Sequence, residues 1–225
     1  MRILLVAPHA DDEVLGVGGT IAKYIDKGYE VYVCVVTSGH PSMFPEDLLN
    51  KLRSEALNAH KFLGIKYTFF LDFPSVMSNK ISVHELNSKV LDVINEIQPS
   101  IVFIPHYGDM HLEHYIVSQT AMVKLRPITD HKTDHKVLEI YSYETLSETE
   151  WNIPHTSNAF LPNTWIDISD YLDKKLEAMS LYSTQVKEFP HPRSLEAIKS
   201  LAKLRGSTIG VDAAEAFSLI RRIVL

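Results

Sequence analysis

The sequence predicts an α/β fold with a doubly wound, mostly parallel sheet flanked by helices. Short β-rich runs alternate with segments of helical periodicity, and polar clusters follow two of these runs. The chain has 225 residues, of which 45% are hydrophobic and 22% are charged. This length and composition suit one domain over residues 1–225 with a sizeable core.

The predicted strands are runs rich in β-branched and aromatic residues, bounded by polar residues, proline or glycine. They are Arg2 to Ala7, Glu30 to Val36, Tyr67 to Leu71, Ile101 to Ile104 and Val137 to Tyr143. Because helical segments separate most of these runs, the strands are expected to pair in parallel, as in a Rossmann-like sheet.

Helical patterns fill most of the intervals between the strands. Ser82 and Glu85 form a capping box, and apolar residues then recur at helical spacing as far as Ile97. Two further helices are predicted over Asp47 to Leu63 and Gly18 to Lys27. A glycine follows each of these two and suits a left-handed helix cap.

Charge and cysteine content exclude several classes of protein. The 22 basic and 28 acidic side chains give a net charge of −6, which disfavours a protein that binds nucleic acid through its phosphates. Cys34 is the only cysteine and lies in an apolar strand, so it predicts a buried thiol and excludes an internal disulfide. The opening apolar run is too short for a signal peptide or membrane span, and we expect a cytoplasmic protein without membrane insertion.

The first polar cluster follows the first predicted strand directly. It contains His9 and three carboxylates, those of Asp11, Asp12 and Glu13. Ligands of open α/β sheets usually bind at the carboxyl ends of the strands, where this cluster is expected. His9 and Asp12 are three residues apart, which leaves Asp11 free to point elsewhere.

The second cluster follows the fourth predicted strand, in the same kind of loop. It contains His106, Asp109, His111, Glu113 and His114. The spacing of His111 and His114 places both imidazoles on one face of a starting helix. Two histidines and one carboxylate with open positions make a catalytic divalent-metal site, for which zinc fits best and iron or cobalt would also serve.

The glycines after the first strand suggest an alternative that the spacing disfavours. Gly16, Gly18 and Gly19 are similar to a dinucleotide-binding loop, but the position of its third glycine is occupied by Ile21. Carboxylates on the same loop would also repel a pyrophosphate. We therefore expect no bound nucleotide cofactor, and we expect these glycines to let a helix pack closely against its neighbours.

Taken together, the segments PHADDEVLGVGG and HLEH resemble the zinc-dependent N-deacetylases of the PIG-L or LmbE-like family. The usual motifs of that family read His-Pro-Asp-Asp-Glu and His-Pro-Asp-His. Ala10 and Leu112 replace the prolines, and Glu113 stands where aspartate is usual. Near the end of the chain, DISDYLDKKLEAMSLYSTQ and RGSTIGVDAAEAF are similar to the closing segments of such enzymes.

The resemblance implies a role for each matching residue. It makes Asp11 the general base and His111 the electrophilic or acid partner. Arg53 is a candidate contact for a substrate hydroxyl or phosphate, although a surface salt bridge would explain it equally well. The implied metal ligands are His9, Asp12 and His114.

The implied activity is that of an amidohydrolase that removes the N-acetyl group from an N-acetylated sugar, with zinc activating the attacking water. The sugar could be a glycoside of N-acetylglucosamine, a sugar phosphate or a nucleotide sugar. Members of this family are often oligomers, so a homo-oligomer is compatible with the resemblance. Two alternatives remain: a non-haem iron(II) oxygenase with a triad of two histidines and one carboxylate, and an inactive sugar-binding module.

Three loops are expected to wall the pocket and to select the substrate, because loops at this edge of an α/β sheet commonly carry function. They are His40 to Glu46, His131 to His135 and Trp151 to Asn163.

Overall fold

A single seven-stranded sheet forms the centre of the computed structural model, which describes residues 1–76, 82–127 and 135–225. The strand order is β3-β2-β1-β4-β5-β7-β6. The five strands from β3 to β5 in this order pair in parallel, whereas β7 is antiparallel to both β5 and β6. The strands are β1 (Arg2–Ala7), β2 (Glu30–Ser38), β3 (Tyr67–Pro74), β4 (Ile101–Pro105), β5 (Glu139–Tyr143), β6 (Thr164–Asp167) and β7 (Ala214–Arg222).

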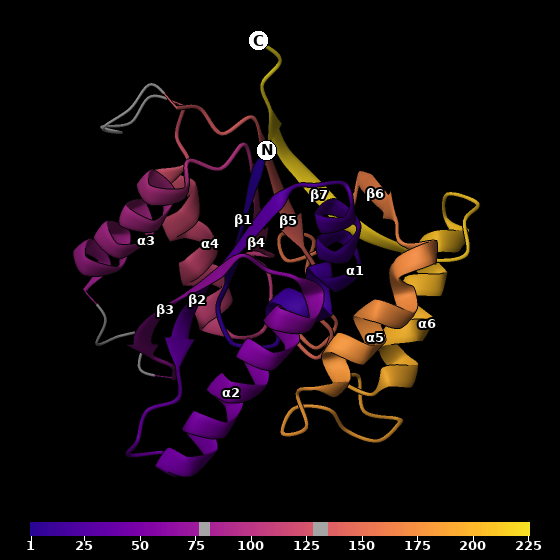
Figure 1. Ribbon diagram of the computed structural model, residues 1–225, viewed down its shortest axis with the longest axis horizontal. Helices are drawn as coiled ribbons and strands as arrows, with labels where there is room; N and C mark the ends of the chain where they lie inside the picture. Colours follow the sequence, from indigo (N-terminus) through magenta and orange to yellow (C-terminus); the bar gives the residue numbers. More distant parts are fainter. Residues whose placement is uncertain (77–81, 128–134) are drawn as a thin grey trace.

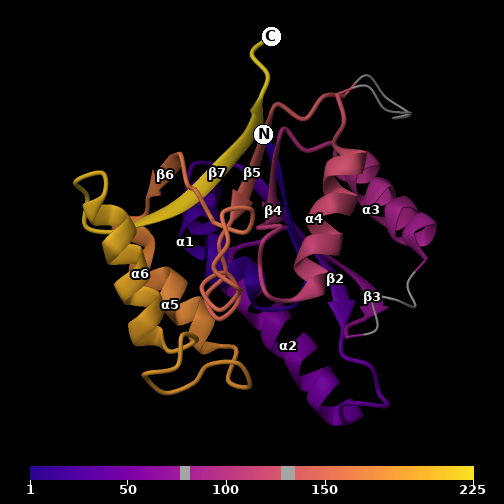
Figure 2. The ribbon, with the colours of Figure 1, turned by 180° about the vertical axis from the view of Figure 1, so that it is seen from behind.

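Helices cover both faces of this sheet (Figure 1 and Figure 2). They are α1 (Asp12–Asp26), α2 (Glu46–Leu63), α3 (Val83–Ile97), α4 (Leu112–Lys124), α5 (Leu172–Ser180) and α6 (Leu195–Ser207), with a short 3₁₀ turn over Ser169–Tyr171. Helices α3 and α4 pack on one face and the other four on the opposite face. The prediction of a doubly wound, mostly parallel sheet is confirmed.

Strand β1 lies at the point where the strand order reverses. Leu5 of β1 is paired with Val33 of β2 on one side and with Phe103 of β4 on the other. The connections from β1 and β4 leave the sheet in opposite directions, so a crevice opens at the carboxyl ends of these two strands. Both polar clusters of the sequence begin there.

The boundaries of several predicted elements were wrong. Helix α1 begins at Asp12 rather than at Gly18, because its glycines pack inside the helix instead of preceding it. Strand β5 begins at Glu139 rather than at Val137. The periodicity of the sequence predicts none of the elements after residue 160, and most of the loop over residues 126–136 lies outside the described residues.

Close packing of α1 depends on its glycines, as expected. A Cβ atom on Gly16 would lie 2.3 Å from the ring of Tyr143 and 2.9 Å from the carbonyl oxygen of Glu144. A Cβ atom on Gly19 would lie 2.6 Å from the side chain of Ile168. Larger residues at these positions would push the helix that carries Asp12 away from the sheet.

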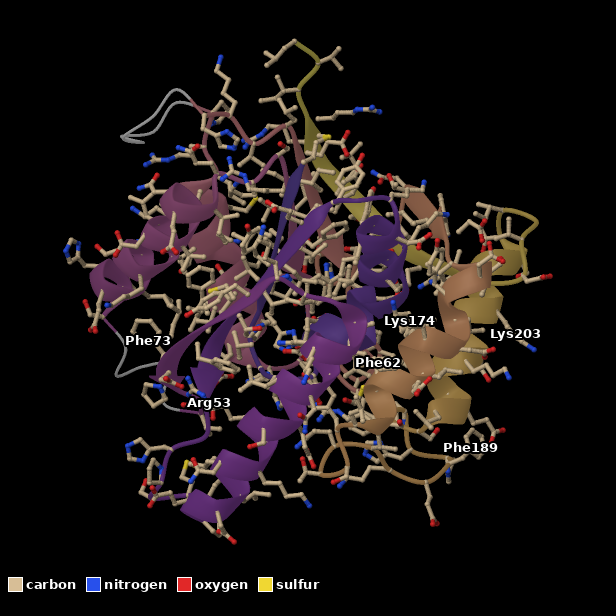
Figure 3. The ribbon with its side chains drawn as sticks, in the orientation of Figure 1. Arg53, Phe62, Phe73, Lys174, Phe189 and Lys203 are labelled. Carbon is tan, nitrogen blue, oxygen red and sulfur yellow. The ribbon has the colours of Figure 1, made fainter. Side chains whose placement is uncertain are left out.

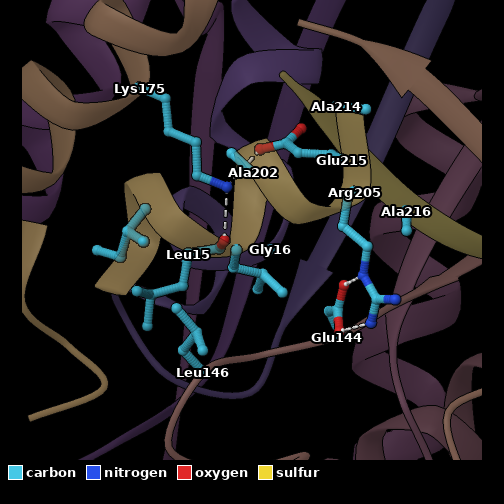
Figure 4. A pocket seen from close by; sticks show the side chains of 12 residues that line it. Leu15, Gly16, Glu144, Leu146, Lys175, Ala202, Arg205, Ala214, Glu215 and Ala216 are labelled. Atoms are coloured by element: carbon cyan, nitrogen blue, oxygen red, sulfur yellow. Dashed lines mark hydrogen bonds and ion pairs between the residues drawn. The ribbon is translucent and has the colours of Figure 1, made fainter. Parts of the chain in front are cut away.

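A buried ion pair fastens the C-terminal elements to α1 (Figure 4). Lys175 of α5 donates to the carbonyl oxygen of Leu15 at 2.8 Å and to Glu215 of β7 at 2.5 Å. The Glu215 carboxylate also accepts the backbone N–H groups of Gly19 and Thr20. The cavity beside this pair has a volume of about 10 Å³, which is at the lower limit for one water molecule. We therefore interpret this region as a structural contact between elements and not as a ligand site.

Cys34 is fully buried in β2, as predicted, and burial raises the pKa of its thiol to about 12. A thiol in that state is an inert core group rather than a nucleophile. Within the described residues, the helices are all too short or too polar to cross a membrane.

Substituting Gly16→Ala is expected to destabilise the fold by about 1–3 kcal/mol, because the new methyl group overlaps Tyr143 and the Glu144 carbonyl. Gly18→Ala in the same helix is the matched control, since its methyl group meets only side-chain atoms, the nearest at 3.1 Å. Urea unfolding of both variants measures the difference. Equal stability would show that α1 and the end of β5 are not in close contact.

Candidate functional site

The two polar clusters meet at the carboxyl ends of β1 and β4. His9 lies in the short connection between β1 and α1, and His111 is the residue before α4, which carries His114 in its first turn. One ring nitrogen from each of these histidines lies within 4.8 Å of the others. Adjacent strands thus bring together residues about a hundred positions apart in the sequence.

Asp12 lies between two of these histidines and is fully buried. Its Oδ2 atom is 3.3 Å from His9 Nδ1 and 3.3 Å from His114 Nε2, and it accepts the backbone N–H of His9 at 2.8 Å. Burial alone would raise the pKa of Asp12, but the contacts with His114 and His9 hold it well below its usual range. The carboxylate is therefore ionised next to the imidazoles.

The donor atoms of this group fit a divalent metal ion. Asp109 Oδ2 lies 2.8 Å from His114 Nδ1, and this contact orients the ring so that Nε2 points toward Asp12. His114 Nε2 and Asp12 Oδ1 are both buried and have no hydrogen-bond partner. Buried polar atoms without partners are costly, and coordination of a cation would satisfy both of them.

Asp11 points away from its neighbour Asp12. Its backbone has φ 123°, an unusual value for a residue other than glycine, and its Oδ2 atom accepts a hydrogen bond from Arg193 Nη1 at 3.1 Å. Burial raises the pKa of Asp11 well above its usual range, against the opposing effect of Arg193, and the carboxylates of Asp12 and Glu13 add to the rise. A raised pKa suits a carboxylate that has to accept a proton.

The Glu13 side chain stabilises the backbone turn at Asp11. One of its carboxylate oxygens accepts the backbone N–H of Asp11 at 3.0 Å. The other accepts the hydroxyl hydrogen of Tyr182 and lies 3.1 Å from His60 Nε2. Glu13 is fully buried, and these contacts connect the turn with α2 and with the segment after α5.

His111 has a carboxylate partner that sequence reasoning missed. Its Nδ1 atom lies 3.1 Å from Glu148 Oε1, and this contact raises the pKa of His111 despite its partial burial. Arg193 Nη2 donates to the same Glu148 oxygen at 3.3 Å. Arg193 and Glu148 therefore connect Asp11 with His111, although neither belongs to a recognisable sequence motif.

The remaining predicted residues lie around this centre. Arg53 of α2 faces β3 (Figure 3), where it donates to both carboxylate oxygens of Asp72 and lies 4.0 Å over the ring of Phe70. It therefore forms the salt bridge considered above and also lines the cavity. His106 contacts the carbonyl oxygen of Asn158 and is not brought into the histidine group.

A cavity of about 460 Å³ opens beside the histidines, within the usual range for small-molecule sites. Its polar residues include His9, Asp11, His111 and Arg193. Phe44, from one of the three loops expected to form the wall, is part of its lining. The described lining residues include none from the loop Trp151 to Asn163. Most of the loop His131 to His135 lies outside the described part of the chain.

This combination defines an α/β protein with a candidate metal centre at the switch point of its sheet. The sequence matches the PIG-L family, described as GlcNAc-PI de-N-acetylase, over residues 4–124. Since the match covers more than half of this chain, the chain belongs to the PIG-L family.

Individual relatives are similar over most of their length. A probable N-acetyl-alpha-D-glucosaminyl L-malate deacetylase 2 of Bacillus anthracis is 26% identical, with 82% of this chain and 81% of the relative covered. The diacetylchitobiose deacetylase of Thermococcus kodakarensis is 24% identical, with 100% and 85% covered. The crystal structure of a conserved protein from Thermus thermophilus has a TM-score of 0.80 at 25% identity, covering 99% and 96%. The family and these deacetylases indicate an N-deacetylase of the amidohydrolase class.

Asp109→Ala is expected to weaken the binding of a divalent metal ion, with added Zn²⁺ as the probe, by about 10–100-fold, because His114 loses the carboxylate that orients its ring. Competition with a chromogenic chelator measures the affinity. Glu113→Gln is the matched control, since Glu113 precedes His114 directly but bonds to the backbone N–H of Val76. Equal affinities for the two variants would contradict the orienting role of Asp109.

Proposed function

We propose that this protein is a zinc-dependent deacetylase that removes the acetyl group from an N-acetylated sugar. One observation carries the proposal: the unpartnered, buried atoms of Asp12 and His114 lie beside His9, at the edge of a cavity lined by Asp11 and His111. These residues thus combine a candidate cation site with two groups that can transfer protons, Asp11 and His111. Metal-assisted amide hydrolysis requires both features.

His9, Asp12 and His114 are the proposed ligands. Two imidazoles and one carboxylate suit Zn²⁺ best, and Fe²⁺ or Co²⁺ would satisfy the same donors. A bound ion of this kind polarises an amide carbonyl and lowers the pKa of water. His111 lies in the same group of nitrogens, but its Nδ1 contact with Glu148 favours a role in proton transfer.

Asp11 is the proposed general base. Its carboxylate lines the cavity and takes the proton of the attacking water, for which its raised pKa is suitable. Arg193 holds one oxygen of this carboxylate in place at 3.1 Å. A base that is already held beside the reacting water increases the rate, because the carboxylate does not have to move before it accepts the proton.

His111 is the proposed acid. The Glu148 carboxylate favours its protonated form, and the protonated ring stabilises negative charge on the acyl oxygen before it donates a proton to the leaving nitrogen. The products are acetate and a free amine on the sugar. Arg53 is proposed to contact a substrate hydroxyl at the rim of the cavity.

The sugar substrate is supported by the relatives that act on N-acetylglucosaminyl compounds and on diacetylchitobiose. An iron(II) oxygenase is not favoured, because such enzymes usually display their triad on a β-barrel rather than on a doubly wound sheet. The intact pair of Asp11 and His111 argues against an inactive sugar-binding module. Action as one domain over residues 1–225, a cytoplasmic location, homo-oligomers and the absence of nucleic-acid partners stay predictions.

Zinc-loaded protein is expected to release acetate from at least one member of a panel of N-acetylated sugars, and an excess of chelator is expected to stop the release. A coupled acetate assay measures the rate. Zinc, iron(II) or cobalt(II) is then added separately to the metal-free protein, and the ions that restore acetate release are those that support turnover. Activity that persists after removal of all divalent metal would contradict the proposed chemistry.

Asp11→Asn is expected to lower kcat by about 10²–10⁴-fold while the protein keeps its zinc, because the variant loses only the base. His111→Gln should behave alike, with loss of turnover and an unchanged zinc content. Metal content is measured by mass spectrometry after gel filtration. Unchanged turnover in the Asp11 variant would refute its role, and loss of zinc from the His111 variant would make His111 a ligand.

A further inference from the structure

The cavity has two regions of different chemistry. Its polar region, with His9, Asp11 and His111, lies at the carboxyl edge of the sheet. Its remaining wall is largely apolar and comes from α2, the loop before α2 and the neighbouring strands. The apolar members include Phe44, Leu48, Leu49, Leu52, Phe70 and Val76.

Part of the apolar wall is open to solvent, whereas Leu52 and Phe70 are half-buried against the core. Leu48 is 38% exposed, Phe44 is 36% exposed and Val76 is 64% exposed. Apolar side chains gathered around a cavity favour a ligand with apolar surface. A single N-acetylated sugar ring offers only its C–H faces and its acetyl methyl group as apolar surface, so the sugar alone would leave most of this wall without a matching contact.

The cationic side chains of the described lining already have acidic partners. Arg53 Nη1 donates to Asp72 Oδ1 at 2.8 Å, and Arg193 donates to the carboxylates of Asp11 and Glu148. Arg193 also donates to the amide oxygen of Gln185. Glu113 adds another carboxylate to the lining. A phosphate or carboxylate on the substrate would have to displace these partners and would meet further negative charge.

We infer that the substrate is an N-acetylated sugar whose aglycone is uncharged and apolar, and that this aglycone lies against the α2 side of the cavity. The inference rests on the proposed function and narrows it, since a glycoside fits this wall while a sugar phosphate or nucleotide sugar does not. A cavity of about 460 Å³ suits a ligand larger than one small fragment.

Matched substrates test the inference: the methyl and phenyl glycosides of N-acetylglucosamine in each anomeric form, and N-acetylglucosamine 1-phosphate. In the preferred anomer, the phenyl glycoside is expected to have a kcat/KM about 10–100-fold above that of the methyl glycoside. This ratio corresponds to the free energy gained when one aromatic ring is buried against the apolar wall. The phosphate is expected to be the poorest substrate.

Two variants locate the effect. Leu48→Ser is expected to lower the phenyl-to-methyl ratio by about fivefold or more through the loss of apolar contact. Leu57→Ser, an exposed leucine of α2 outside the cavity lining, is the matched control and should leave the ratio unchanged. Asp72→Asn removes the acidic partner of Arg53 and should raise the relative rate on the phosphate.

The outcomes separate this inference from the proposed function. Equal rates on the phenyl and methyl glycosides, preference for the phosphate, or a ratio that Leu48→Ser leaves unchanged would overturn the apolar aglycone while deacetylation stands. Acetate release from none of these substrates, nor from the wider panel, would overturn the proposed function itself.

Discussion

The backbone turn at Asp11 is the constraint on which the site depends. A φ of 123° at a residue other than glycine costs about 1–3 kcal/mol and persists only where surrounding contacts enforce it. Here the enforcing contacts are side chains of the same motif, because Glu13 accepts the N–H of Asp11 and Asp12 accepts the N–H of His9. The turn sends three successive carboxylates in three directions.

Each direction leads to a different environment, and this difference underlies the separate roles that we propose for the neighbouring acids. Asp12 faces two imidazoles and has a lowered pKa, whereas Asp11 faces Arg193 and has a raised one. Glu13 points into the core toward Tyr182 and His60. The close approach of α1 to the sheet, which its glycines permit, keeps this arrangement at the end of β1.

Much of the fold could be predicted locally, because the N-terminal strands and helices have clear periodicities and caps. The elements β6, β7, α5 and α6 could not, since their fit depends on distant contacts such as the pair of Lys175 with Glu215. The antiparallel pairing of β7 with β5 has no local signature either. The start of α1 was misplaced because glycine disfavours a helix unless close packing requires it.

The sequence by itself determined that two polar clusters share one edge of the sheet, since His9 with Asp12 and His111 with His114 follow two strands of an α/β sheet at i,i+3. Only the tertiary structure decided which partners each donor meets. Asp109 with His114, Glu148 with His111 and Arg193 with Asp11 are contacts of that kind. Glu148 and Arg193 belong to no sequence motif, because an electrostatic contact depends on the distance between two groups in space and not on their spacing in the sequence. Only folding brings these groups together.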